Sequence, residues 1–330
     1  MVLLGQEIEK KERPNMKHVE DKLLVQIAQM YYQEDKNQSQ ISKELNIHRS
    51  TISRLLKKSR EEGIVTITIN YDLAGTYSLE KELEEVYGLK KAIVVPTAID
   101  IQSEQKLQLL GSATNDYLQS ILDDNMTIGF SWGQAMSMVA AELQETEVQN
   151  LMCLPLIGGP SGRLIGEYHV NTITFEASKK LKSKAVLIDS PAFPETKELK
   201  EALMANQFNQ DLVQLWQQLS IAVFGIGSPQ MKDSARWQLF YDDNILEELE
   251  EQVVGDVVSR FYDAKGQHIS SKLDERLIGI SIDQLKKVDY RIAVAESLEK
   301  ASAIRGALRG KYMNVLVTTQ ETAEAILKDI

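Results

Sequence analysis

The chain has 330 residues, 43% of them hydrophobic, and its 37 basic and 48 acidic residues give a formal net charge of −11. This length predicts about two domains with a sizeable core, and the acidic balance excludes nonspecific coating of nucleic acid or of an anionic membrane. The single cysteine, Cys153, excludes an intramolecular disulfide framework and fits a reducing cytoplasm, where we expect the protein to act.

The N-terminal segment is polar and lacks the features of a signal peptide. We expect residues 1–15 to be a disordered tail and residues 19–33 to form a scaffold helix with Leu23, Leu24 and Ile27 turned inward. No apolar run approaches the about 18 residues that a membrane span requires. We therefore expect no membrane partner.

Residues 39–60 predict two short helices joined by a tight turn. Apolar residues recur at helical spacing in both halves, and Asn46 and Ile47 fall between them, where a turn would place a polar residue and an apolar plug. This spacing is typical of a helix-turn-helix, whose second helix enters the DNA major groove. We assign residues 16–71 to this DNA-binding domain. The apolar residues are Ile41 and Leu45 in the first helix, then Ile52, Leu55 and Leu56 in the second.

The second of these helices carries five basic residues between positions 49 and 60 and no acidic one. Arg49 and the hydroxyl residues beside it can reach base edges, whereas the later cations can contact phosphates, which supply affinity rather than sequence choice. A basic run can also be a merely solvated helix face, and the role of Arg49 and Ser50 as base readers stays open. The expected DNA-binding residues are Ser39, Gln40, Arg49, Ser50, Thr51, Ser53, Arg54, Lys57 and Lys58.

Gly63 is a suitable helix stop. Residues 64–71 then alternate apolar and polar side chains, which predicts a strand-like wing flanking the DNA-binding helices. Asp72 and Gly75 predict a linker, and residues 78–87 an acidic amphipathic helix. We group residues 72–89 as linker and helix.

From residue 90 to residue 330, short β-branched runs alternate with helical stretches. This alternation predicts an α/β domain, Rossmann-like in the loose sense, with a mostly parallel sheet covered on both faces. Strands are expected at 92–96, 127–130, 152–157, 185–189, 221–225, 290–294 and 314–318, and helices at 103–122, 133–144, 167–182, 297–309 and 320–328.

Glycine-rich loops follow several of these strands, at 129–135, 155–162, 225–229 and 255–266. Ligands of open α/β sheets bind beyond the carboxyl ends of the strands, where loops enter helices. One glycine loop alone is more often a turn than an anion site. Several at successive strand ends predict a shared binding crevice, to which the approach to Lys300 also belongs.

Five motifs carry a resemblance to a known family: S-W-G from Ser131, P-L-I-G-G from Pro155, G-D-V-V-S-R-F-Y-D-A-K-G from Gly255, R-L-I-G-I-S from Arg276, and A-S-A-I-R-G-A-L-R-G-K-Y-M-N-V-L-V-T-T from Ala301. Following a helix-turn-helix, this combination resembles the SorC family of bacterial sugar-binding transcriptional regulators. The resemblance covers residues 18–330.

The resemblance implies a winged helix-turn-helix joined to a sugar-phosphate-binding domain similar to ribose-5-phosphate isomerase and glucosamine-6-phosphate deaminase, without their catalysis. It further implies operator DNA and a phosphorylated sugar or related metabolite as partners, a homodimer or homotetramer, and no cofactor. Carried over position by position, the effector site comprises Gly133, Gln134, Ala135, Ile157, Gly158, His169, Asn171, Asp256 and Lys300.

Several positions depart from what relatives usually carry. Gln134 and Ala135 stand where relatives often have threonine, and Ile157 stands where some have arginine or lysine, so it cannot form a Schiff base. Glu296 and Ser297 replace two glycines before the family lysine. These departures put a requirement for a phosphate group on the effector in question.

The residues themselves suggest roles in the crevice. Lys300 is the best cation for a ligand phosphate, Asp256 an acceptor for sugar hydroxyls, and His169 a donor or acceptor at the pocket edge. Each residue can also have no role in binding. Lys300 can be a surface lysine on a helix, Asp256 an aspartate in a turn at a strand end, and His169 a histidine packed in a helix. The four histidines lack metal-ligand spacing, so no metal site is expected.

The sequence thus predicts a transcriptional regulator, a repressor in preference to an activator, of a carbohydrate or nucleoside catabolic operon. One alternative is a sugar-phosphate isomerase or deaminase fused to a DNA-binding module, with Asp256 as base and Lys300 as anion stabiliser. Another is an adaptor that binds DNA constitutively and uses its α/β domain only to oligomerise.

Overall fold

The computed structural model describes residues 14–65, 71–97, 102–160, 166–229 and 252–328. The chain divides into two compact units, residues 1–70 and 71–330. Of the tail expected over residues 1–15, only positions 14 and 15 are described, and they already belong to the first helix. The expected wing over residues 64–71 falls largely on residues 66–70, outside the described residues.

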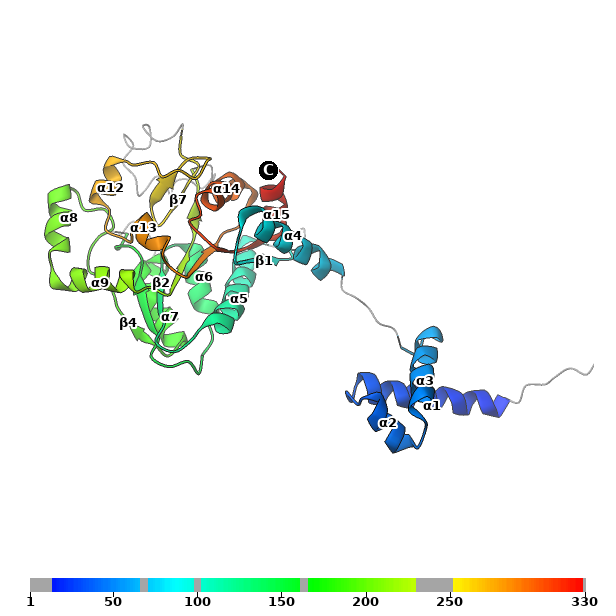
Figure 1. Ribbon diagram of the computed structural model, residues 1–330. Helices are drawn as coiled ribbons and strands as arrows, with labels where there is room; N and C mark the ends of the chain where they lie inside the picture. The colour runs from blue at the N-terminus through cyan, green and yellow to red at the C-terminus, as the bar shows by residue number, and fades with distance from the viewer. Residues whose placement is uncertain (1–13, 66–70, 98–101, 161–165, 230–251, 329–330) are drawn as a thin grey trace, which may run out of the picture. The chain divides into compact units, whose positions relative to one another are not determined.

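The described residues of the first unit form three helices, α1 (Pro14–Tyr32), α2 (Gln38–Leu45) and α3 (Arg49–Glu61) (Figure 1). Their apolar stripes meet in one small core, as the sequence predicts. The buried members are Leu24, Ile27, Met30, Ile41, Ile52, Leu55 and Leu56, with Leu45 and Ile47 packed against them.

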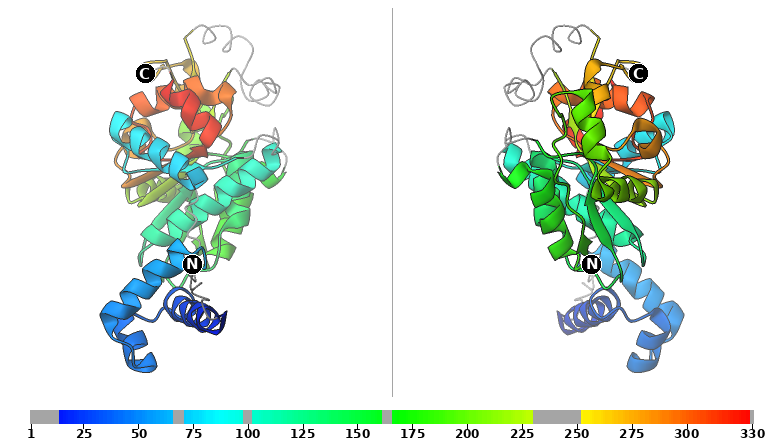
Figure 2. Two further views of the ribbon diagram at one scale, coloured as in Figure 1. Left: turned by 90° about the vertical axis from the view of Figure 1, so that its right-hand side faces the viewer. Right: turned by 90° about the vertical axis from the view of Figure 1, so that its left-hand side faces the viewer.

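One helix, α4 (Tyr71–Tyr87), spans the residues that the sequence assigned to a linker and a shorter helix. The linker expected around Asp72 and Gly75 is therefore wrong. A Cβ atom at Gly75 would meet nothing within 4 Å, so this glycine stands in open space and is not required for close packing. Figure 2 shows α4, in cyan, against the C-terminal helix α15 (Gln320–Leu327), in red.

The second unit is built on a seven-stranded parallel sheet in the order β1-β10-β9-β5-β2-β3-β4. Six of these strands lie within one residue of a start that the sequence predicted, whereas β4 shares only Ala185 with the strand expected at 185–189. The strands are β1 (Lys91–Val95), β2 (Thr127–Phe130), β3 (Met152–Pro155), β4 (Lys184–Ala185), β5 (Ile221–Phe224), β9 (Tyr290–Val294) and β10 (Val315–Thr319).

The strands bury side chains on both faces, since alternate residues belong to two different hydrophobic clusters. In β5, Ile221 and Val223 pack with α5 (Ser103–Ile121), α6 (Gln134–Glu142) and α7 (Val170–Lys180). Ala222 and Phe224 face the other cluster, to which α4, α15, α9 (Gln207–Gln217) and α14 (Ala301–Arg309) contribute. The α/β class and the burial of both sheet faces are confirmed.

A three-stranded antiparallel sheet is an element that the sequence did not predict. It joins β6 (Ile226–Gly227), β7 (Gly255–Val257) and β8 (Arg260–Tyr262). The short helices α8 (Lys197–Met204), α12 (Lys272–Arg276) and α13 (Ile282–Leu285), and the 3₁₀ turns Gly166–Tyr168 and Leu298–Lys300, complete the described elements. Among the residues that the structure describes, no helix is both long and apolar enough to cross a membrane.

Candidate functional site

The turn between α2 and α3 is fixed by local hydrogen bonds. Asn37 caps α2, where its side chain accepts from the backbone N–H of Gln40 at 3.0 Å while the Gln40 side chain accepts from the N–H of Asn37 at 2.8 Å. Asn46 ends α2 in the left-handed conformation, at φ 53°. The turn thereby sets the angle between the two helices and places Ile47 against the core.

Helix α3 presents its basic face outward while its apolar stripe is buried. Arg49, Ser53, Arg54 and Lys57 are exposed, and Thr51 and Lys58 are half-buried. This division leaves a continuous polar face on a helix anchored from behind, which is the requirement for insertion into a DNA groove.

Four side chains among the expected DNA contacts have partners within the protein; one is Lys58, whose Nζ lies 3.6 Å from Glu62 Oε1. Gln40 completes the cap of α2, and Ser50 Oγ lies 2.8 Å from His48 Nδ1. Lys57 pairs with Glu61, at 3.6 Å between Nζ and Oε1, because α3 runs on to this acidic residue beyond the basic run. Arg49, Ser53 and Arg54 are therefore the more available contacts.

His48, which the sequence reasoning missed, is the N-cap residue of α3. Its Nδ1 accepts from the backbone N–H of Ser50 at 3.4 Å, and the side chain is exposed at the end of the helix that would face bases. Its position directly before the basic helix was the available signal, although histidine is not among the common N-cap residues.

In the second unit, the switch point of the large sheet lies between β2 and β5. The chain passes from β2 outward to β3 and β4, returns to β5, and continues in the opposite direction through β9 to β10. Ligands of open α/β sheets bind at such a point, beyond the carboxyl ends of the strands. Ser131, directly after β2, accepts a hydrogen bond from the N–H of Gly225 after β5 at 3.4 Å.

Gly133, Gln134 and Ala135 form the start of α6 at this switch point. Gly133 is the N-cap, with φ 106°, and its N–H donates to the carbonyl of Tyr168 at 3.1 Å. Gln134 is exposed and Ala135 half-buried. This arrangement presents backbone N–H groups at a helix start, where they can bind an anionic or hydroxyl oxygen.

The expected role of Ile157 as a crevice-lining side chain is not met, because its side chain is fully buried in the core. Its backbone pairs with Gly279 in an isolated bridge. Gly158 is also buried, and a Cβ there would lie 2.6 Å from the backbone of Pro191. These two residues shape the loop after β3 by packing.

His169 and Asn171 fix the start of α7 and the loop after β4. His169 caps α7, with Nδ1 accepting from the N–H of Asn171 at 3.1 Å, and burial lowers the pKa of its imidazole. The Asn171 side chain donates to the carbonyl of Ile188 at 2.8 Å and accepts from its N–H at 3.0 Å. The oxygen and the nitrogen of the Asn171 side-chain amide thus each have a backbone partner, so the role of Asn171 is to position the loop after β4.

Asp256 lies in β7 and Lys300 in the 3₁₀ turn after β9, and the charges of Asp256 and of Glu296, a carboxylate outside the predicted site set, both act on Lys300. Burial lowers the pKa of Lys300, whereas Glu296 and Asp256 act to raise it. Burial raises the pKa of Glu296, opposed by Lys106 and Lys300. Both carboxylates therefore favour the charged form of Lys300.

The loop that carries Glu296 is also conformationally unusual. Ser297 has φ 106° and ψ 144°, a region populated almost entirely by glycine, and its N–H donates to Thr322 Oγ1 at 3.0 Å. Its own Oγ is buried and has no hydrogen-bond partner among the described residues. Strain and an unpartnered hydroxyl thus coincide beside Lys300.

No group of three or more histidine, cysteine, aspartate or glutamate side chains within the described ranges could hold a metal ion. Cys153 is wholly buried, and burial raises the pKa of its thiol to about 11. It packs as an apolar residue and shows none of the acidity of a reactive thiol.

Comparison with known proteins covers both units. Residues 71–328 match the family profile of a sugar-binding domain, and residues 19–66 match that of a homeodomain-like domain. The chain is 41% identical over 309 residues to the sorbitol operon regulator of Klebsiella pneumoniae, across 93% of this chain and 98% of the relative. It is 32% identical over 319 residues to the deoxyribonucleoside regulator of Bacillus subtilis, across 96% of this chain and 100% of that relative.

The crystal structure of the full-length sorbitol operon regulator SorC from Klebsiella pneumoniae is similar throughout, with a TM-score of 0.76 and 40% identity over 93% of this chain and 99% of that one. The two units and these matches define a DNA-binding transcriptional regulator with a sugar-binding domain. The chain belongs to the SorC family, so the resemblance seen in the motifs is confirmed.

Proposed function

We propose that the protein is the repressor of a carbohydrate or nucleoside catabolic operon and that a sugar, phosphorylated or closely related to a sugar phosphate, controls its binding to the operator. The observation that carries the DNA-binding part is the exposed face of α3, where Arg49, Ser53 and Arg54 stand on a helix anchored by its buried stripe. The names of the relatives, regulators of a sorbitol operon and of deoxyribonucleosides, support the choice of pathway class.

The effector part rests on the second unit. The start of α6 offers backbone donors, Asp256 in β7 offers a carboxylate, and the segment after β9 offers the carboxylate of Glu296 and the cation of Lys300. Sugar hydroxyls both donate and accept hydrogen bonds, so they suit a mixed set of this kind. We infer that Asp256 accepts from effector hydroxyls and that Lys300 binds the most negative group of the effector.

Control follows from linkage between the two units in a homodimer or homotetramer. An effector that binds one arrangement of subunits better than another biases the spacing of two DNA-binding units. Preferences of about 1 to 3 kcal/mol at each of several coupled sites are enough to switch operator occupancy.

Fluorescence anisotropy of DNA from upstream of the gene and its neighbours tests this proposal. We expect the double variant Arg49→Ala, Arg54→Ala to lose operator binding while its circular dichroism and effector binding match the wild type. Lys43→Ala is a matched control, because Lys43 is an exposed cation on the preceding helix α2 and should leave affinity within about twofold. Unchanged affinity in the double variant would refute the assignment of α3.

Effector control is tested by adding a panel of sugars and sugar phosphates to the protein–DNA complex. At least one compound should change the affinity about tenfold, or roughly 1.4 kcal/mol. Lys300→Gln and Asp256→Asn should abolish that response without altering DNA affinity in the absence of effector. If no compound has an effect, the constitutive adaptor replaces the effector-controlled repressor.

One observation favours a second candidate, an enzyme acting on sugar phosphates. Glu296 is a carboxyl group whose pKa burial raises, beside Lys300 and Asp256, so a second acid or base is present at the strand ends. Turnover of pentose or hexose phosphates by the pure protein, abolished in Asp256→Asn and Glu296→Gln, would establish the enzyme. We expect no turnover above background.

A further inference from the structure

A cavity of about 540 Å³ lies in the second unit between the three-stranded sheet and α13. This volume falls within the range of small-molecule sites, about 300 to 1,000 Å³. None of the residues assigned to the strand-end effector site lines it. Its lining comes from four separate segments of the chain and comprises Arg260, Gly266, Gln267, His268, Ser281, Ile282, Asp283, Lys286 and Tyr312.

The lining holds two full cations, Arg260 and Lys286, against one carboxylate, Asp283, with the His268 imidazole beside them. Lys286 Nζ lies 4.8 Å from the centroid of the Tyr312 ring, so the ammonium packs over an aromatic face. Lys286 forms no ion pair with any residue in the part of the chain that the structure describes. Its charge is therefore available to a ligand.

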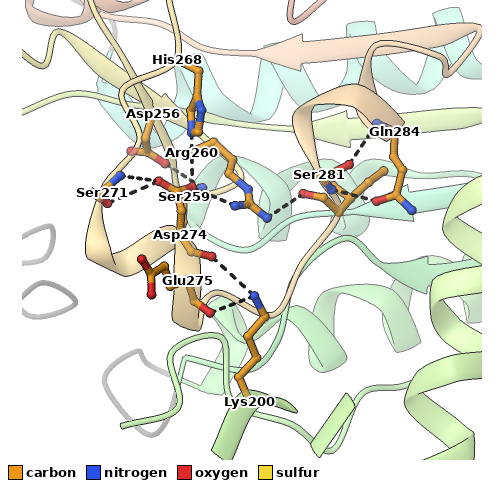
Figure 3. Close-up of polar contacts among 11 residues, drawn as sticks. Lys200, Asp256, Ser259, Arg260, His268, Ser271, Asp274, Glu275, Ser281 and Gln284 are labelled. Atoms are coloured by element: carbon orange, nitrogen blue, oxygen red, sulfur yellow. Dashed lines mark hydrogen bonds and ion pairs between the residues drawn. The ribbon is translucent and has the colours of Figure 1, made fainter. Parts of the chain in front are cut away.

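Arg260 is held in place by a half-buried network around Asp274 (Figure 3). Its Nη1 donates to Asp274 Oδ1 at 2.8 Å, and His268 Nε2 lies 3.2 Å from the same oxygen. The second carboxylate oxygen of Asp274 accepts from the N–H of Ser271 at 2.9 Å. The guanidinium is thus pre-oriented before any ligand arrives, which lowers the entropic cost of binding.

The guanidinium still has unused donor capacity. Its Nη2 reaches the carbonyl of Ile280 only at 3.5 Å, the outer limit of a hydrogen bond. Its Nε is buried and has no hydrogen-bond partner among the described residues. Because solvent does not reach this Nε, the donor capacity that a ligand can use is that of the Nη2 group.

We propose that this cavity is a second ligand site, which binds the phosphate or carboxylate group of a small metabolite between Arg260 and Lys286. A guanidinium and an ammonium that converge on one space are suited to an oxyanion, because both donate charge-assisted hydrogen bonds. Gln267 and Ser281 add neutral polar groups for the remainder of the ligand.

The same arginine connects the cavity to the strand-end site. Ile280, whose carbonyl Arg260 approaches, donates its N–H to Leu156 at 2.8 Å, and Gly158 donates to Ile278 at 2.9 Å. Residues 278–280 therefore form an extended arm paired with the loop after β3. These backbone hydrogen bonds hold the arm, so a ligand that moves the guanidinium acts on the arm through the Ile280 carbonyl, and we infer that this contact couples the two sites. This coupling rests on the proposed function, whereas the binding itself does not.

Isothermal titration calorimetry of the full-length protein with inorganic phosphate, at constant ionic strength in chloride buffer, tests the site. Succinate in a parallel titration distinguishes a carboxylate ligand from a phosphate ligand. We expect saturable binding that Lys286→Gln weakens about tenfold and Lys286→Arg retains. Lys287→Gln is the matched control, since Lys287 is an exposed neighbour that does not line the cavity, and it should bind as the wild type does.

Lys300→Gln separates this site from the strand-end crevice and should leave the Lys286-dependent binding intact. Absence of saturable binding for both anions, or equal weakening in Lys286→Gln and Lys287→Gln, would overturn the proposal. Because calorimetry requires no DNA, failure of operator binding would refute the proposed function without affecting this result. An effector response unchanged by saturating anion would overturn the coupling.

Discussion

Replacing Ser297 by glycine should stabilise the second unit, although glycine in place of serine in an ordered loop usually lowers stability. The φ of 106° and ψ of 144° at Ser297 cost a residue with a Cβ about 1 to 3 kcal/mol. Its buried Oγ has no described partner and costs about 1 to 3 kcal/mol more. Glycine removes both penalties but adds about 0.5 to 1 kcal/mol of conformational freedom to the unfolded chain. The net gain is at least about 1 kcal/mol.

Thermal unfolding followed by circular dichroism measures this gain. For a unit of this size, about 1 kcal/mol shifts Tm by about 2 to 4 °C, so Ser297→Gly should raise Tm by at least about 2 °C. Ser281→Gly is the matched control, because Ser281 has an ordinary φ of −78° and its Oγ accepts from the N–H of Gln284 at 3.1 Å. It should lower Tm. A Tm for Ser297→Gly at or below that of the wild type would refute the strain argument.

Two further variants probe buried polar contacts. Burial acts to raise the pKa of Asp274, but hydrogen bonds from His268, Arg260 and Ser271 outweigh it and lower the pKa from 3.8 to about 2. The folded state gains this stabilisation fully above the pKa of Asp274 in the unfolded chain and loses it as pH falls toward about 2. Asp274→Asn should therefore lower the free energy of unfolding in urea by about 2 kcal/mol at pH 7 and by progressively less in acid. A loss that does not depend on pH would contradict this linkage. Trp216 Nε1 donates to the buried carbonyl of Pro155 at 2.8 Å, so Trp216→Phe should lower the unfolding free energy by about 1 to 3 kcal/mol, and an unchanged urea midpoint would show that the carbonyl finds another donor.

Those parts of the fold that depend on local periodicity were predictable from the sequence. The stripes at Ile41 and Leu45 and at Ile52 and Leu55 gave α2 and α3 because helical spacing dictates which side chains can share a core. Strands β2 and β9 match their expected residues for a related reason: their apolar runs are buried on both faces of a parallel sheet.

The prediction failed where structure depends on distant partners. The three-stranded sheet has strands of two or three residues, which are too short to show a periodic pattern. Its first two strands, β6 and β7, pair although they are far apart in the sequence, at Ile226–Gly227 and Gly255–Val257. Gly75 suggested a linker, yet an exposed glycine is tolerated within α4.

In the candidate site too, residues could be predicted one by one from the local sequence, whereas contacts between distant residues could not. Asp256 and Lys300 were predicted separately from the ends of two strands, and the fold places them in electrostatic contact. Ile157 turned into the core because the bridge to Gly279 fixes its backbone, a contact between residues 122 positions apart in the numbering. The cavity at Arg260 was not predicted: Arg260, Ser281 and Tyr312 belong to three of the family motifs, but nothing in the sequence shows that these segments meet.

The acidic face of α4 determines where the chain can be cut if the second unit is to be produced alone. β1 is an edge strand of the large sheet, and the carboxylates of Glu84 and Glu80 accept from its outward N–H groups at Ala92 and Val94, at 3.2 and 2.9 Å. Open N–H groups on an edge strand invite a second chain to add to the sheet and aggregate. A fragment cut at residue 90, the domain boundary expected from the sequence, would uncover this edge, whereas one cut before Tyr71 keeps it covered.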